Sequence, residues 1–412
     1  MKILSFTTLW PNPMQPFYGL FNRERIRTLA KLCDLRVVAP VPWFMSVKWL
    51  GRYYYQNYCQ LPGYEKSEDL EVFHPQYLVI PKLLKFSDAF LMHASLRTFL
   101  RNLRKEFAFD LIDAYYAYPD GVAASYLAEA LGVPYTVSVL GSDITLFGKE
   151  RLRGTLIRRS LQSANRVLCV SDSLKAELIT THDIPSEKID VIENGVDCQK
   201  FCPLPKIDAR RQLDLPADAH ILLSVGHLRE LKGFHLLVEA LHTLQHSKTY
   251  SSPLKLLIVG GDYPWDPTYK DRLVRQIQEY GLQEHVVLAG AKRPDELHYW
   301  YSAADVFCLV SSREGCPNVI LESLACGTPI VATPVGDIPK LVPRQDLGIL
   351  VERNVESIRR GIVEALEQTW NHDGIVEYAQ QFSWERTSAK ICTIYEGLIA
   401  GASRAQTSGQ DV

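Results

Sequence analysis

Short apolar runs separated by longer helical patterns are the feature that most limits how this chain can fold. Most of the runs are rich in Val, Ile and Leu and do not alternate with polar residues, which is typical of strands covered on both faces. Strand–helix alternation of this kind predicts the α/β class, with doubly wound parallel sheets that carry helices on both faces. The predicted strands are residues 2–6, 35–39, 111–114, 135–140 and 166–171 in the first half, and 221–225, 254–259, 286–289, 306–309, 330–332 and 347–351 in the second.

The alternation occurs twice along 412 residues, which is about the length of two domains. A turn at Asn194, followed by a polar segment that ends near Pro216, predicts the boundary between them. Ser383 can cap a final helix, and the last residues have the composition of a disordered tail. The predicted division is therefore 1–195, 196–382, a final helix over 383–400 and a tail over 401–412.

Charge and cysteine content exclude some classes of protein. The net charge is −2 with acids and bases well mixed, which argues against a nucleic-acid partner. The nine cysteines form no C-x-x-C pair, and their odd number in a long chain favours reduced thiols in a cytoplasmic protein. The sequence shows neither a signal-peptide pattern nor an apolar run of 18 residues, so we expect a protein that is cytoplasmic or peripheral to the inner face of the membrane.

The stretch from Ser311 to Gly336 predicts an anion site. A strand and a loop precede Pro317, which fits the first position of a helix, and Gly327 fits its end. The start of this helix leaves backbone N–H groups free near the positive end of the helix dipole, and phosphate is the anion that such sites usually bind.

Two glutamates, Glu314 and Glu322, flank this helix start. Carboxylates repel phosphate but accept hydrogen bonds from vicinal hydroxyls, so phosphate between two polyhydroxylated ends describes a nucleotide-sugar. The alternative is that Glu314 is an ordinary loop charge and that Glu322 is a solvated helix residue.

The stretch EGCPNVILESLACGTPIVA, which begins at Glu314, resembles the E-x7-E signature of the family 4 retaining glycosyltransferases of GT-B fold (glycosyltransferase group 1 type). The resemblance implies two Rossmann-like domains with an interdomain cleft, a final helix that crosses back to the first domain, and sugar transfer with retention of anomeric configuration. Other segments that carry it are VIENGVDCQKF, SVGHLRELKGFHLLVEAL, LIVGGD and VVLAGAKRPDELHYWYSAADVFCLVSSREG, and more weakly FYGLFNRER, DAYYAYPDGVAA and LGSDI in the first half.

By this resemblance, the second domain binds a nucleotide-diphosphate sugar. Glu322 would hold the ribose, Glu314 the hydroxyls of the transferred sugar, and Lys232 the diphosphate. The family usually has an arginine where this chain has His227, so either Arg229 supplies the second cation or Lys232 acts with weaker help. The loop assigned to the sugar and diphosphate contains Gly315, Cys316, Pro317, Asn318 and Val319, and the loop assigned to the base contains Gly290 and Lys292.

The first domain departs from the family where a histidine usually follows the strand. Tyr115 takes the nearest matching position and Tyr116 is the alternative; a tyrosine can hydrogen-bond a hydroxyl but is a poor general base near neutral pH. Asp143 either faces the donor or acceptor or caps the following helix. Asp120 is expected to cap the helix after it, and Gly19 matches the glycine that lets the first loop approach the donor.

No metal or other cofactor is expected, because no Asp-x-Asp pair follows a predicted strand and Lys232 with the helix dipole can stabilise the leaving diphosphate. For the mechanism we favour attack on the same face of the sugar, since Glu314 is occupied by hydroxyls and no second carboxylate nucleophile is evident. Glu314, Lys232, Arg229, Asp143 and Tyr115 are thus the residues predicted to take part in the reaction.

The acceptor side is less constrained. Residues 43–64 and 78–105 interleave basic residues with aromatics and leucines, which suits the surface of an anionic membrane and a lipid-linked acceptor; alternatively, the aromatics fill the first domain's core. The predicted function is sugar transfer to a glycan or lipid-linked acceptor, in bacterial cell-surface polysaccharide or glycolipid biosynthesis. The alternatives are a sugar phosphorylase or synthase of the same fold and a non-catalytic nucleotide-sugar sensor.

Overall fold

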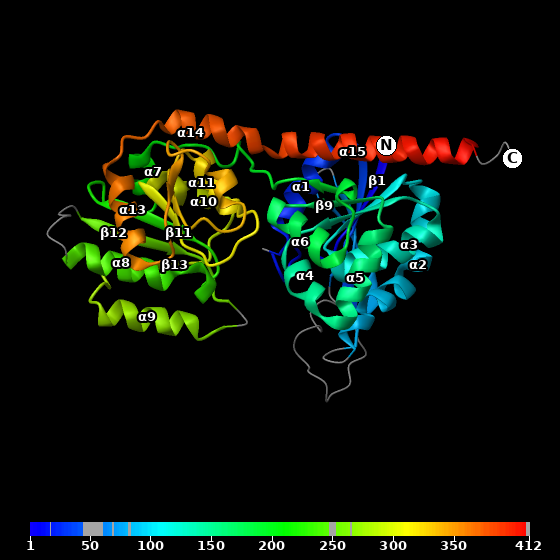
Figure 1. The fold of residues 1–412 in the computed structure, drawn as a ribbon, viewed down its shortest axis with the longest axis horizontal. Helices are drawn as coiled ribbons and strands as arrows, with labels where there is room; N and C mark the ends of the chain where they lie inside the picture. Colours follow the sequence, from blue (N-terminus) through cyan, green and yellow to red (C-terminus); the bar gives the residue numbers. More distant parts are fainter. Residues whose placement is uncertain are drawn as a thin grey trace. The chain divides into compact units, whose positions relative to one another are not determined.

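The computed structural model describes residues 1–16, 18–43, 61–67, 70–80, 84–246, 253–263 and 266–408, with side chains up to residue 402 in the last helix. It divides into two compact units (Figure 1). Unit 1 contains Met1–Asn194 and Trp384–Val412, and unit 2 contains Gly195–Ser383. These limits lie one residue from the boundaries predicted from the sequence.

Unit 1 is built on a sheet in which, among the described residues, the strand order is β10-β9-β8-β7-β1-β2-β5-β4. Neighbouring strands are parallel except β4 and β5, which form an antiparallel pair at one edge. The order reverses between β1 and β7. The strands are β1 (Lys2–Phe6), β2 (Asp34–Val38), β4 (Tyr64–Ser67), β5 (Leu70–Phe73), β7 (Leu111–Tyr115), β8 (Tyr135–Val139), β9 (Arg166–Cys169) and β10 (Ile189–Val191), with β3 (Val41–Trp43) and β6 (Gln76–Leu78) paired separately.

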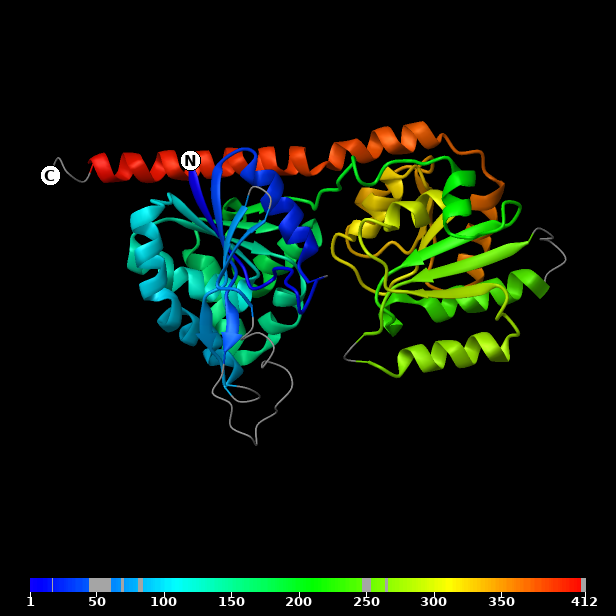
Figure 2. The same ribbon diagram turned by 180° about the vertical axis from the view of Figure 1, so that it is seen from behind.

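Helices cover both faces of this sheet (Figure 2). The final helix packs against the first, and Ile391 and Tyr395 join Ile26 and Leu29 in one apolar core. Ser171 caps one helix, because its hydroxyl accepts from Leu174 N. The helices of unit 1 are α1 (Leu20–Ala30), α2 (Asp88–Glu106), α3 (Val122–Leu131), α4 (Ser142–Thr145), α5 (Arg151–Ser163), α6 (Asp172–His182) and α15 (Trp384–Ser408), with shorter turns η2 (Lys85–Ser87), η3 (Ala117–Gly121), η4 (Phe147–Lys149) and η5 (Ser186–Lys188).

The last helix of unit 1 is longer than predicted, and the aromatic and basic segments of this unit are described only in part. Helix α15 continues to Ser408, past the predicted end at residue 400, and Ala, Arg and Gln in that stretch are good helix formers; residues 409–412 lie outside the described part. Of the aromatic and basic segments, residues 44–60 and 81–83 also lie outside it, whereas helix α2 buries one face through Met92, Leu96 and Leu100. None of the described helices is both long and apolar enough to span a membrane.

Unit 2 is built on a parallel sheet with the order β13-β12-β11-β14-β15-β16, which reverses between β11 and β14. Helix α8 packs with α9 and α13, and α10 packs with α7 and α11 (Figure 1). The strands are β11 (His220–Val225), β12 (Leu254–Val259), β13 (Val286–Gly290), β14 (Val306–Leu309), β15 (Ile330–Ala332) and β16 (Gly348–Leu350). The helices are α7 (Lys206–Gln212), α8 (Phe234–His246), α9 (Tyr269–Glu279), α10 (Leu297–Ala303), α11 (Asn318–Ala325), α12 (Ile338–Leu341), α13 (Val355–Glu367) and α14 (His372–Ala379), with turns η6 (Glu230–Lys232) and η7 (Gln380–Phe382).

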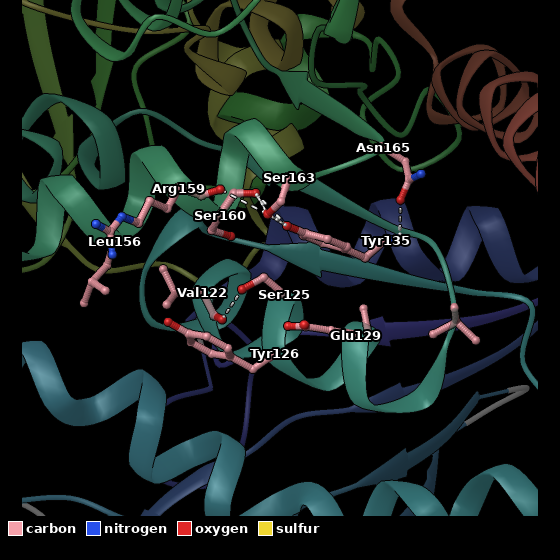
Figure 3. A pocket seen from close by; sticks show the side chains of 12 residues that line it. Val122, Ser125, Tyr126, Glu129, Tyr135, Leu156, Arg159, Ser160, Ser163 and Asn165 are labelled. Atoms are coloured by element: carbon pink, nitrogen blue, oxygen red, sulfur yellow. Dashed lines mark hydrogen bonds between the residues drawn. The ribbon is translucent and has the colours of Figure 1, made fainter.

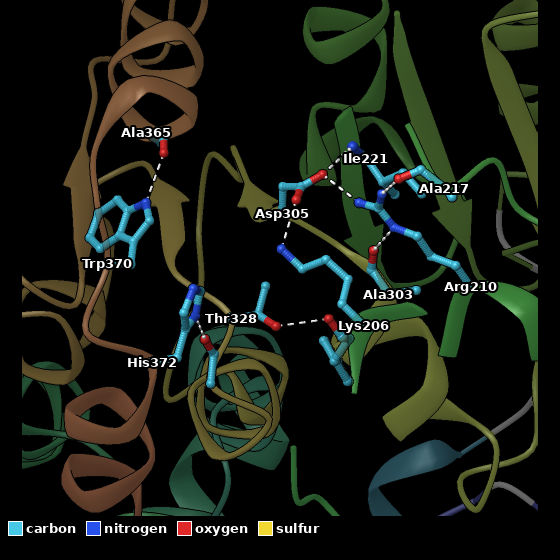
Figure 4. A network of polar contacts seen from close by, with 12 residues as sticks. Lys206, Arg210, Ala217, Ile221, Ala303, Asp305, Thr328, Ala365, Trp370 and His372 are labelled. Atoms are coloured by element: carbon cyan, nitrogen blue, oxygen red, sulfur yellow. Dashed lines mark hydrogen bonds and ion pairs between the residues drawn. The ribbon is translucent and has the colours of Figure 1, made fainter. Parts of the chain in front are cut away.

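A polar network fixes the starting ends of the two central strands of unit 2 (Figure 4). The carboxylate of Asp305, which precedes β14, accepts from Ile221 N at 2.7 Å and from Arg210 Nη2 at 2.8 Å. Lys206 Nζ lies 2.7 Å from the other Asp305 oxygen. Because β11 and β14 are tied together at their starts, the loops that follow their carboxyl ends are held in a defined register.

Candidate active site

The loops after β11 and β14 lie at the point where the strand order of unit 2 reverses. In open α/β sheets, ligands bind at the carboxyl ends of the strands beside such a reversal. The first loop, residues 226–233, carries Lys232, and the second, residues 310–317, carries Glu314. The sequence-predicted donor residues therefore fall at the edge where a ligand is expected.

Lys232 and Glu314 form an ion pair, with Lys232 Nζ 2.7 Å from Glu314 Oε1. The hydroxyl of Ser311 donates to the same oxygen at 2.5 Å. Both charged side chains are largely buried, with 17% and 12% of their surface exposed. The stem of Lys232 runs beside Gly226, where an added Cβ would lie 3.2 Å from Lys232 Cε. Glu314 is therefore a built-in partner of the lysine rather than an ordinary loop charge.

Glu322 lies in helix α11, where its carboxylate accepts a hydrogen bond from Tyr301 Oη at 2.7 Å. Tyr301 itself is completely buried in α10. Burial raises the pKa of Glu322, while the tyrosine hydrogen bond and the charge of Lys200 act in the opposite direction. Glu322 is therefore not a freely solvated helix residue, and Tyr301 is a partner that the sequence motif alone did not reveal.

The start of α11 is shaped by its neighbours in the loop. Pro317 precedes the helix as its N-cap residue, with φ −77°, and not as its first helical residue as predicted, so helical geometry begins at Asn318. Gly336 has φ +59°, and a Cβ there would lie 2.3 Å from Glu314 O, so only glycine allows this close approach. Asp337 N donates to Gly315 O at 3.0 Å. In this loop Cys316 and Pro317 are buried, whereas Gly315, Asn318 and Val319 are partly exposed.

The two candidates for the second cation differ in their surroundings. His227 is exposed, with its ring 6.2 Å from the ring of Tyr263. The guanidinium of Arg229 lies 4.3 Å from the centre of the same tyrosine ring. Arg229 is thus held over an aromatic face at this edge, an arrangement that keeps its hydrogen-bond donors available.

The loop predicted to read the base follows β13. Gly290 ends that strand with φ +71° in open surroundings. Lys292 Nζ lies 5.3 Å from the centre of the Trp300 ring, in a cation–π contact. Both residues lie at the carboxyl end of β13, a strand in the same sheet as β11 and β14.

In unit 1, the loops after β1 and β7 meet at the corresponding reversal of strand order. The backbone N–H and hydroxyl of Thr8 both donate to Asp120 Oδ2 at 2.9 Å. Asp120 does not cap α3 as predicted, because its buried carboxylate joins two loops instead. Gly19 has φ +68°, and a Cβ there would lie 2.1 Å from Leu9 O, which explains why glycine stands at this position.

Asp143 also holds loops together rather than facing a ligand. Its buried carboxylate accepts from Ala117 N at 2.9 Å, Gly141 N at 2.8 Å and Leu140 N at 3.1 Å. It lies within α4 and makes none of that helix's capping bonds. Burial raises the pKa of Asp143 to about 6 and that of Asp120 to about 8, although hydrogen bonds to each carboxylate oppose the shift.

Of the two tyrosines left open by the sequence, Tyr115 is the wrong choice for a residue that touches substrate. Its side chain is completely buried in the core beside Tyr395, with Arg25 5.0 Å from its ring centre. Tyr116 follows β7 with φ +86°, and its hydroxyl lies 2.7 Å from Ser142 Oγ. Tyr115 is the last residue of the buried strand β7, whereas Tyr116 begins the turn beyond it, so a step of one residue leaves the core for the edge.

The described part of the chain contains no cluster of three or more His, Cys, Asp or Glu side chains arranged to hold a metal ion. A cavity of about 570 Å³ lies between α3 and α5 in unit 1, with hydroxyls of Tyr135 and Ser163 on its wall (Figure 3). None of the predicted site residues lines that cavity.

Comparisons with known proteins identify the family of this chain. A model of the family described as "Glycosyl transferases group 1" matches residues 205–382, and one described as "Glycosyltransferase Family 4" matches residues 58–200. The Bacillus subtilis (strain 168) protein TuaC, named for teichuronic acid biosynthesis, is 28% identical over 378 residues, which are 90% of each chain. D-inositol 3-phosphate glycosyltransferase of Streptosporangium roseum is 30% identical over 306 residues, which are 71% of this chain and 70% of that protein.

Solved structures share the fold. Sucrose-phosphate synthase of Thermosynechococcus elongatus superposes with a TM-score of 0.74 at 20% identity, over 97% of this chain and 100% of that one. HepE of Anabaena in complex with UDP gives a TM-score of 0.72 at 20% identity, over 96% and 100%. Fold and sequence together define a glycosyltransferase. The chain belongs to the family 4 (group 1) glycosyltransferases of GT-B fold.

Proposed function

We propose that this glycosyltransferase uses a nucleotide-diphosphate sugar, which unit 2 holds, and transfers the sugar to a glycan or lipid-linked acceptor. The observation that carries the proposal is the grouping of Lys232, Glu314 and Glu322 around the start of α11, at the reversal of strand order. HepE, which shares the fold, has been solved with UDP and with UDP-glucose, which supports a donor of this class.

In this proposal the donor lies across the helix start. Glu322 accepts from the ribose hydroxyls, and the amides at the start of α11 support the phosphates. Lys232, with Arg229 beside it, stabilises the charge that develops on the diphosphate as it leaves. These cations and the helix dipole supply the electrophilic help without a metal ion, so the proposed reaction is metal-independent.

The ion pair between Lys232 and Glu314 implies an exchange when the donor binds. In the free protein the two charges neutralise each other at 2.7 Å. A diphosphate offers Lys232 a more highly charged partner, and Glu314 is then released to accept from the hydroxyls of the transferred sugar. The carboxylate of Glu314 thus lowers the affinity for a nucleotide without a sugar, but it provides contacts that only a sugar can use.

The proposed chemistry retains the anomeric configuration. The bond between the anomeric carbon and the diphosphate oxygen breaks, and the acceptor oxygen forms its bond on the same face of the sugar. The acceptor proton passes to the leaving diphosphate oxygen, so no protein base is needed. At this edge of unit 1, Asp120 and Asp143 both accept from backbone N–H groups, so neither is proposed as a base.

The acceptor is proposed to be a hexose- or inositol-type hydroxyl compound of cell-surface polysaccharide or glycolipid assembly. The relatives' names, teichuronic acid biosynthesis and D-inositol 3-phosphate glycosyltransferase, support a polyhydroxylated acceptor. In unit 1, the exposed hydroxyls of Tyr116 and Ser142 are the groups that we propose bind it. Leu84 and Phe90 are exposed around the beginning of α2, and the same helix carries exposed arginines at 97 and 101, which supports peripheral contact with the cytoplasmic side of a membrane.

The first test is a thermal-shift screen against UDP, GDP, ADP and their sugars, followed by a product assay with the donor that stabilises the protein. A ligand that binds the folded state raises the melting temperature, so we expect one base to stand out. Transfer or slow donor hydrolysis should follow with that donor. Turnover of a sugar phosphate with inorganic phosphate, or tight binding with neither transfer nor hydrolysis, would overturn the proposal.

A further inference from the structure

The turn that carries Lys232 and the loop that carries Glu314 are joined through their backbones. Ser312 N, in the loop after β14, donates to Leu231 O in turn η6 at 2.8 Å. Gly233 closes the turn with φ +76°, and a Cβ there would lie 2.4 Å from Val310 O. The two loops are therefore in direct contact, and their separation is set by a small number of backbone groups.

Arg353 bridges the same two loops from a third position. Its Nε donates to Val310 O at 3.1 Å, and its Nη2 donates to Glu230 O at 3.4 Å. One accepting carbonyl belongs to the first residue of the Glu314 loop, and the other belongs to the turn of Lys232. Arg353 thus hydrogen-bonds to the backbones of the loops that carry Lys232 and Glu314, and not to the side chains of these two residues.

Hydrogen bonds hold the backbone on both sides of Arg353. Val351 N, two residues earlier, donates to Ala332 O at the end of β15 at 2.9 Å. The next residue, Asn354, caps α13 by accepting from Ser357 N at 2.8 Å. A side chain anchored between a strand end and a helix cap can hold its donors in a constant position.

The chemistry of the contact requires a guanidinium. Its planar fork presents several N–H donors at fixed angles, so it can reach carbonyls on two different loops at once. A lysine at Arg353 has the same charge, but its ammonium is a compact group on a flexible stem and can satisfy at most part of this geometry.

We propose that Arg353 is a positioning residue, which sets the separation of Lys232 and Glu314 and so lets one donor molecule reach both. This inference rests on the donor-binding roles proposed above for that pair. The affinity for ligands that contact only the start of α11 should not depend on Arg353. The affinity for a complete nucleotide-sugar, which spans the diphosphate and sugar positions, should depend on it.

The test compares Arg353→Ala and Arg353→Lys with Arg360→Ala, an exposed arginine of α13 that serves as a matched control. Affinities for UMP and UDP-glucose, or for the matching ligands of whichever base stabilises the wild type, are measured with kcat and the melting temperature. We expect Arg353→Ala to lose roughly tenfold in kcat and in UDP-glucose affinity while UMP affinity stays within about twofold. Arg353→Lys should recover part of the loss, and Arg360→Ala should match the wild type.

Equal losses for UMP and UDP-glucose, or a lower melting temperature with unchanged affinities and kcat, would assign Arg353 a purely structural role and overturn the inference. A wild type that binds and transfers from no nucleotide-sugar would instead overturn the proposed function. The two failures are therefore distinguishable in the same set of measurements.

Discussion

The two units place acidic residues at the same kind of sheet edge but use them differently. In unit 2, Glu314 is paired with a lysine and Glu322 with a tyrosine hydroxyl, and both keep carboxylate capacity for a ligand. In unit 1, Asp120 and Asp143 are completely buried. Asp120 accepts from the N–H and the hydroxyl of Thr8, and Asp143 accepts from three backbone N–H groups. We therefore propose that the edge of unit 2 exchanges partners when a donor binds, whereas the edge of unit 1 holds its own shape.

The largest effect is expected at the edge of unit 2, where Lys232 and Glu314 are proposed to exchange partners. Glu314→Gln should lower kcat by roughly 100-fold or more, because the carboxylate contacts that we propose for the transferred sugar would be lost. Lys232→Ala should lower kcat to a similar degree by removing charge stabilisation from the leaving diphosphate. Steady-state kinetics with the identified donor measure both. Activity within about threefold of the wild type in either variant would break the contrast between the two edges.

Replacement of Asp143 tests whether the edge of unit 1 contributes to the stability of the fold. Asp143→Ala leaves three backbone N–H donors without their acceptor, so the free energy of unfolding should fall by about 2–4 kcal/mol. Urea unfolding followed by circular dichroism measures the loss, with Glu322→Gln as the comparison from unit 2. If Glu322→Gln destabilises the protein as much as Asp143→Ala does, the two edges do not differ as described.

The structural role of Asp120 predicts that the free energy of unfolding depends on pH. Its pKa is raised from 3.8 to about 8, so the folded state binds more protons than the unfolded state between these values. The free energy of unfolding should therefore decrease as pH rises through this window, by up to about 1.4 kcal/mol per pH unit. Histidines with lowered pKa values also titrate near this interval, so the contribution of Asp120 is obtained from the difference between the wild type and Asp120→Asn.

Unfolding of wild type and Asp120→Asn is compared at pH 6, 7 and 8. The stability difference between them should shift in favour of Asp120→Asn as pH rises. A difference that stays constant with pH would show that the carboxyl is already ionised at pH 6.

The smallest expected effect concerns Tyr301. Tyr301→Phe removes one hydrogen bond to Glu322, so nucleotide affinity should fall by roughly threefold to tenfold. Isothermal titration with the identified nucleotide measures the change. Affinity equal to that of the wild type would show that Glu322 needs no internal partner to accept the ribose.

The sequence predicted unit 2 in more detail than unit 1 for a physical reason. The helix start, both glutamates and the closing Gly327 lie within one short stretch, so local spacing encodes their arrangement. The strands over 254–259, 306–309 and 330–332 match the observed bounds as well.

Unit 1 could not be predicted in this way, because its decisive contacts join distant residues. Asp120 was expected to cap a helix, yet its partner Thr8 lies 112 positions away. Tyr115 and Tyr116 are adjacent in sequence, but one is in the core and the other at the edge. Two contacts of unit 2 were likewise not predictable from local spacing: Tyr301 donates to Glu322, and Arg353 donates to carbonyls of the Lys232 and Glu314 loops.

The central claim is that Lys232 and Glu314 neutralise each other until a donor diphosphate takes the lysine. Isothermal titration of UDP, or of the diphosphate of the base identified, into wild type, Glu314→Gln and Lys232→Ala tests it most directly. The account predicts that Glu314→Gln binds the diphosphate more tightly than the wild type, since the competing carboxylate charge is gone, and that Lys232→Ala binds it more weakly. Weaker binding by Glu314→Gln, or unchanged binding by Lys232→Ala, would contradict it.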